Sequence, residues 1–160
     1  MIPIRDENPT SSPAVITFLL IAINVAVFLT EPIFAGGRSP GQQAIRQASY
    51  FTCHAAVPYE LTHGRTVTDA LARGVSFQQL DLSYARLEKF SCPNKNVWAS
   101  ILESMFLHGS ILHIAGNMLF LWIFGNNVED RLGRIKYILF YLLSGLAAAY
   151  AQSAVFPNSG

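Results

Sequence analysis

The sequence predicts an all-α, polytopic membrane protein, and three observations support this fold class. Of its 160 residues, 51% are hydrophobic and only 13% are charged, whereas about one quarter of the residues of a soluble domain are charged. The mean hydropathy is +0.32. Three apolar segments are each about 18–20 residues long, the length with which a helix crosses about 30 Å of hydrocarbon. These segments must be helical, because lipid offers the backbone no hydrogen-bond partners.

Three membrane spans are predicted from these segments, at residues 13–30, 105–124 and 137–156. The first segment could instead be a signal peptide that is cleaved near Phe34–Gly36. However, its apolar core is longer than that of a usual signal peptide. The residues before it also mix Arg5 with Asp6 and Glu7 rather than carrying a clean positive charge. We therefore expect a retained helix.

The short loop between the second and third spans, residues 125–136, contains Arg131, Arg134 and Lys136. The positive-inside rule places this loop in the cytoplasm. The N-terminus is then cytoplasmic as well, and residues 31–104 form a non-cytoplasmic loop. No long targeting leader precedes the first span, which favours a bacterial inner membrane. The net charge of +1 and the lack of a basic cluster give no sign of a nucleic-acid partner.

The long first loop contains short helical patterns. Residues 42–51 and 66–73 each fit a short helix, the second of which stops at Gly74, and a third helix is predicted over residues 77–90. The loop also keeps many Phe, Tyr and Leu residues. These features favour a small folded cap on the membrane surface over a disordered loop.

Two cysteines, Cys53 and Cys92, lie in this loop. A disulfide is permitted on the non-cytoplasmic side of a membrane, so we expect the two to be bonded, although their spacing fixes no geometry. A metal site formed by Cys53, His54, His63 and Cys92 is the alternative. It lacks the tight CxxC or HxxxH spacing of such sites, and we expect neither a metal nor another cofactor.

The most informative stretch is His108–Asn117, because it places polar side chains at the head of an apolar run. Residues 105–128 contain no Lys, Arg, Asp or Glu, and a polar side chain at membrane depth is costly enough to suggest a function. His113 and Asn117 are four residues apart and therefore share a helix face. A metal or haem site using His108 and His113 is disfavoured, because they are separated by about 140° on a helix and asparagine is a poor ligand for such metals.

These residues resemble a motif of the rhomboid family of intramembrane serine proteases. The matching elements are the upstream His108, the H-x-x-x-N pair of His113 and Asn117, and the GNNVEDRLG loop of Gly125–Gly133. The first span and the segment Val57–Gly64 are also similar to pieces of that family. The similarity is weakest between residues 65 and 96. One further departure is that Trp98 is followed by Ala99, where many members have a Trp-Arg pair.

The resemblance implies a core of six transmembrane helices and a Ser-His dyad. In that family, a serine on the fourth helix attacks the peptide carbonyl and a histidine on the sixth helix is its base. The substrates are transmembrane or membrane-proximal segments of other membrane proteins. Asn117 and His113 match the family's oxyanion-hole donors, which stabilise the charge that develops on the attacked carbonyl.

The nucleophile and base of the dyad are not found among these residues. The family's serine lies in a G-x-S-G motif, but the only similar segment here is Pro157–Gly160. We reject Ser159 as the nucleophile, because Pro157 replaces the first glycine and no helix follows. No histidine follows His113. The chain is therefore expected to hold three of the six helices and the oxyanion-hole side only, and to be inactive alone. The alternative is a non-catalytic rhomboid-like protein that binds membrane helices, although such a protein has no need of oxyanion donors.

Overall fold

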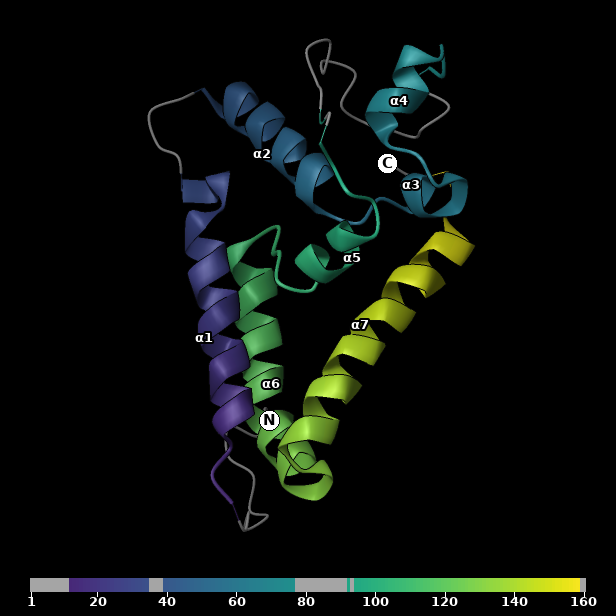
Figure 1. The fold of residues 1–160 in the computed structure, drawn as a ribbon. Helices are drawn as coiled ribbons and strands as arrows, with labels where there is room; N and C mark the ends of the chain where they lie inside the picture. Colours follow the sequence, from purple (N-terminus) through teal and green to yellow (C-terminus); the bar gives the residue numbers. More distant parts are fainter. Residues whose placement is uncertain (1–11, 35–38, 77–91, 93, 159–160) are drawn as a thin grey trace. The chain divides into compact units, whose positions relative to one another are not determined.

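The computed structural model describes residues 12–34, 39–76, 92 and 94–158. Within these residues all regular structure is helical, which confirms the predicted all-α class (Figure 1). The helices are α1 (Val15–Thr30), the short 3-10 helix η1 (Pro32–Phe34), α2 (Pro40–His54), α3 (Pro58–His63), α4 (Val67–Ala72), α5 (Ala99–Ser104), α6 (Ile111–Leu132) and α7 (Arg134–Val155).

The chain divides into two compact units. The first contains residues 1–30 and 108–143, and the second contains residues 31–107 and 144–160. Helix α7 begins in the first unit and ends in the second.

Helices α6 and α7, with 22 residues each, are long and apolar enough to cross a membrane. Helix α1 is also apolar but has only 16 residues. Helix α6 starts six residues after the predicted span and continues to Leu132, into the segment predicted as a loop. Gly133 ends the helix with a φ of +75°, a backbone conformation that glycine adopts without strain.

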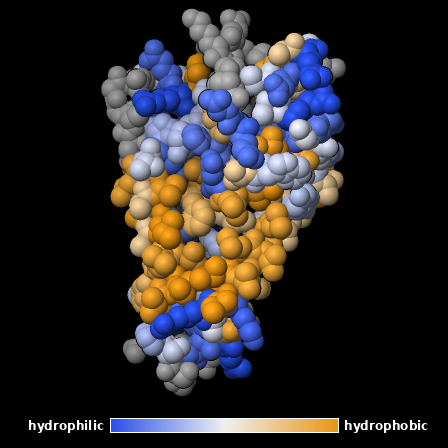
Figure 2. Space-filling view, in the orientation of Figure 1, coloured by the Kyte–Doolittle hydropathy of each residue, from blue (hydrophilic) through white to orange (hydrophobic). Residues whose placement is uncertain are grey.

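In the first unit, helix α1 packs antiparallel to α6, and Figure 1 shows the two helices side by side. The buried residues of α1 recur every three or four positions and form one stripe: Thr17, Leu20, Asn24 and Phe28. The opposite side of α1 exposes large apolar residues such as Phe18, Leu19 and Leu29. Hydrophobic residues cover the surface of these helices in Figure 2, as expected of surfaces that contact lipid.

Gly125 of α6 lies where a larger residue would not fit. A Cβ atom added there would lie 2.7 Å from the Tyr137 hydroxyl oxygen and 2.9 Å from Cγ2 of Thr17. We expect Gly125→Ala to lower the free energy of unfolding by about 1–3 kcal/mol, because neither neighbour can easily move aside. The measurement is an unfolding titration of the purified protein with SDS in mixed micelles. Gly116→Ala, on the same helix with nothing within 4 Å, is the control and should be neutral or stabilising. Equal losses for the two variants would contradict the packing argument.

The second unit confirms two of the three helices predicted in the first loop. Helix α2 contains the predicted residues 42–51. Helix α4 is capped at its start by Thr66, whose side chain accepts from the Asp69 N–H at 3.1 Å. Gly74 follows α4 with a φ of +86°. The helix predicted over residues 77–90 lies outside the described residues.

Two small apolar clusters stabilise this unit, and so the described part of the first loop is folded, as predicted. The first cluster joins α3 to α4 through Val57, Tyr59, Val67 and Ala70. The second joins α3 to α5 through Leu61, Val97 and Ile101, and Ala149 of α7 packs against it.

Candidate functional site

The start of α6 positions the two side chains that the sequence identified. Ser110 has extended backbone angles and its hydroxyl accepts from the His113 N–H at 3.2 Å. This N-cap satisfies one of the free N–H groups of the first turn. It therefore fixes His113 within the first turn of α6 and Asn117 one turn further along.

His113 and Asn117 are brought together on one open face of α6. Both are exposed, whereas Ile114 between them is 7% exposed. Phe120, which is 64% exposed, continues the same face. The N-terminal end of a helix carries partial positive charge. An imidazole N–H and a carboxamide NH₂ are therefore available as donors to an anionic atom on this face, near the positive end of the helix.

His108 lies just before α6 and is only 2% exposed. The centroid of its ring is 5.2 Å from that of His113, with the planes at 63°, and 6.4 Å from that of Phe28 in α1. The upstream histidine is thus a packed aromatic neighbour of His113. Among the described residues, no group of three or more His, Cys, Asp or Glu could hold a metal ion.

The GNNVEDRLG segment contacts the N-terminal end of α1. The Glu129 carboxylate, which is 2% exposed, accepts from the backbone N–H groups of Ile16 (3.0 Å) and Thr17 (2.8 Å) and from the Thr17 hydroxyl (2.9 Å). Asp130 accepts from the backbone N–H and hydroxyl of Ser12. Glu129 therefore provides the acceptors that two of the first N–H groups of α1 cannot find within their own helix, and Asp130 binds the residue that lies three positions before that helix.

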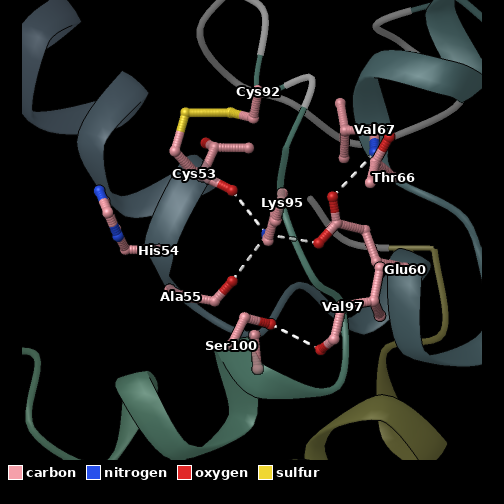
Figure 3. A network of polar contacts seen from close by, with 12 residues as sticks. Cys53, His54, Ala55, Glu60, Thr66, Val67, Cys92, Lys95, Val97 and Ser100 are labelled. Atoms are coloured by element: carbon pink, nitrogen blue, oxygen red, sulfur yellow. Dashed lines mark hydrogen bonds and ion pairs between the residues drawn. A yellow bond between two sulfur atoms is a disulfide. The ribbon is translucent and has the colours of Figure 1, made fainter.

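In the second unit, a buried ion pair joins three segments (Figure 3). The Lys95 ammonium bonds to the Glu60 carboxylate and donates to the carbonyl oxygens of Thr52 (2.6 Å) and Ala55 (2.8 Å) at the C-terminal end of α2. The other oxygen of Glu60 accepts from the Val67 N–H, at the first residue of α4 (2.8 Å). The side chains of Lys95 and Glu60 are 2% and 1% exposed.

The charges of this pair suit the helix ends that they contact. A cation lies at the negative end of α2 and an anion at the positive end of α4. Burial lowers the pKa of Lys95 below its ordinary value, and the hydrogen bond and charge of Glu60 oppose that shift. The pair is thus a buried link between helices α2, α3 and α4.

Cys53 and Cys92 form a disulfide, which confirms the expected bond. It links the last turn of α2 to the segment that precedes Lys95 (Figure 3). Because both sulfur atoms are used in this bond, the alternative metal site loses two of its four ligands. Its histidines have other contacts: His54 lies 3.0 Å from the Glu103 carboxylate, and His63 stacks on Tyr59.

The sequence did not reveal that three polar residues are buried: Asn24 of α1, Glu129 of α6 and Glu60 of α3, which pairs with Lys95. Asn24 is 1% exposed and its side-chain N–H donates to the Leu20 carbonyl at 2.7 Å. A polar residue within an apolar segment is itself a signal, and it applied to Asn24 as it did to Asn117. Ser159, which we rejected as a nucleophile, lies outside the described residues.

Comparison with known proteins finds a family match over the part of the chain that contains α5, α6 and α7. Residues 94–160 match the rhomboid domain. A rhomboid protease GlpG from Enterobacter sp. (strain 638) is 39% identical over 57 residues, which are 36% of this chain and 20% of the relative. The GlpG of Salmonella newport is 42% identical over 48 residues, or 30% of this chain and 17% of the relative. The aligned part thus spans about a fifth of these relatives. No solved structure matches the chain.

Proposed function

We propose that the protein is an intramembrane serine endopeptidase, because residues 94–160 match the rhomboid domain. It would cleave transmembrane or membrane-proximal segments of membrane-protein substrates. The observation that carries this proposal is the placement of His113 and Asn117 on one open face, at the N-terminal end of an apolar helix.

The role of this face is to stabilise an oxyanion. When a nucleophile attacks a peptide carbonyl, negative charge develops on the carbonyl oxygen. The Asn117 NH₂ and a His113 N–H would donate to that oxygen, and the positive end of α6 would lower its energy further. In a water-poor site such donors act more strongly than in bulk water.

Under this proposal the Ser-His dyad would lie outside these 160 residues, since they contain no G-x-S-G motif and no histidine after His113. The test is labelling with a serine-reactive fluorophosphonate. The product of the complete reading frame should be labelled, and the 160-residue polypeptide should not. Labelling of the short form at Ser159 would contradict the assignment. A complete protein that binds membrane helices but resists labelling would instead support the non-catalytic alternative.

We also propose that the protein is multi-pass in a bacterial inner membrane, with its N-terminus in the cytoplasm. Support comes from Arg131, Arg134 and Lys136 near the junction of α6 and α7, and from the Cys53–Cys92 disulfide, which suits the oxidising side. The N-terminal end of α6 would then lie near the non-cytoplasmic surface, where water for hydrolysis is available.

Asn117→Ala in the complete protein is expected to lower kcat by about 10²–10³-fold, because one donor to the oxyanion is lost. KM for a membrane-embedded substrate should change little, since the donor acts mainly in the transition state. The measurement is cleavage of a fluorogenic transmembrane substrate in liposomes.

Gln152→Ala is the matched control, because it removes an exposed carboxamide from α7 rather than from the candidate site. It should leave kcat within about twofold, as is usual for a surface substitution. A similar loss in both variants would mean that Asn117 has no special part in the reaction.

A further inference from the structure

A surface cavity of about 320 Å³ lies beside the disulfide in the second unit. Both cysteines line it, together with His54, Lys95 and Glu103. The cavity opens to solvent, and both partners of the disulfide are among its lining residues. Cys92 is 8% exposed and Cys53 is partly exposed, so a reagent in the cavity can approach the bond.

The disulfide holds the same two segments that the Lys95 ammonium joins. Cys53 follows Thr52, whose carbonyl accepts from Lys95, and Cys92 precedes Lys95 by three residues. The Lys95 N–H donates to the Cys92 carbonyl at 3.2 Å, and the Cys92 N–H donates to the Thr68 hydroxyl at 3.0 Å. Opening the disulfide therefore removes the covalent constraint that keeps Lys95 at the end of α2.

We propose that Cys53–Cys92 is an exchange site for a dithiol reductant that enters through this cavity, and that its reduction withdraws Lys95 from the end of α2. One thiolate of the dithiol bonds to a cysteine sulfur, the protein S–S bond breaks, and the other cysteine leaves as a thiolate that takes up a proton. The second thiol of the reductant then attacks the mixed disulfide. The protein gains two thiols, and the dithiol is oxidised to a disulfide.

The surroundings of the bond favour this exchange. A cation near a sulfur stabilises the thiolate form, and Lys95 is among the residues that line the same cavity as both cysteines. A lower thiolate energy makes a cysteine a better leaving group. The bond also closes a loop with a sequence separation of 39, so its opening restores considerable freedom to the chain between.

The consequence can be measured through the reactivity of Lys95 toward a water-soluble acylating reagent, read by mass spectrometry on the purified protein in detergent. In the oxidised protein Lys95 should be protected, because its side chain is 2% exposed and bonded to three oxygens. After dithiothreitol is added without denaturant, its acylation rate should rise by at least about tenfold, as expected when a protected group opens locally. Lys136, which is exposed, is the internal control and should react equally in both states.

The variant Cys53→Ser/Cys92→Ser should show the fast acylation of Lys95 without any reductant. If that variant does not fold, the comparison of oxidised and reduced wild-type protein remains decisive. Three results would overturn the proposal: two free thiols before reductant is added, a disulfide that dithiothreitol reduces only in denaturant, or a Lys95 that stays protected after reduction. None of these readouts depends on protease activity.

Discussion

Glu129→Gln is expected to lower the free energy of unfolding by about 3 kcal/mol, because hydrogen bonds to a charged group contribute about 1.5–3 kcal/mol each. The Glu129 carboxylate is buried and accepts three hydrogen bonds from α1. Glutamine has nearly the same size, but it replaces one acceptor oxygen by an NH₂ group that faces N–H donors. The measurement is an SDS unfolding titration in mixed micelles, followed by circular dichroism.

Asp130→Asn is the matched control, since it makes the same chemical change at the next residue. Asp130 accepts from the N–H and hydroxyl of Ser12, where the contact is exposed. Water can replace these bonds, so a loss below about 1 kcal/mol is expected. If the two variants lose equal stability, Glu129 does not act as the cap of α1.

Glu129 also shows why part of the fold could not be predicted from the sequence. Hydrophobic composition placed the apolar segments, but it assigned residues 125–136 to a loop because charges gather there. Helix α6 instead continues to Leu132. The partner of Glu129 is Thr17, 112 positions away in the sequence, and no local pattern reveals such a pairing.

Local signals were more successful where they act over a few residues. Thr66 caps the start of α4 and Gly74 follows its end, as the capping and turn preferences of these residue types predict. The four-residue spacing of His113 and Asn117 also placed both on one face of α6, because that spacing is a property of the helix itself. Their assignment as oxyanion donors stays a proposal.

The buried link of the second unit was not predicted, although each of its residues was visible. Lys95 and Glu60 are separated in sequence by about half of the first loop, and each alone resembles an ordinary surface charge. Burial is what distinguishes them. An ion pair removed from water requires several partners to offset the loss of hydration, and here two helix ends provide them.

Lys95→Met is expected to lower the free energy of unfolding of the oxidised protein by about 3–5 kcal/mol, because it leaves a buried carboxylate without a counter-ion. Methionine keeps most of the volume of the side chain, so a packing defect is not the main effect. The carbonyls of Thr52 and Ala55 also lose their donor. The loss should appear in the unfolding transition of the second unit, followed by the fluorescence of Trp98 in detergent.

Glu103→Gln is the control for charge alone, since it breaks the half-exposed His54–Glu103 pair in the same unit. Its cost should stay below about 1 kcal/mol, as for exposed ion pairs in general. Combining Lys95→Met with Glu60→Leu should recover more than half of the loss, because no unpaired charge is then buried. If Lys95→Met costs no more than Glu103→Gln, the Lys95–Glu60 pair does not hold the first loop together.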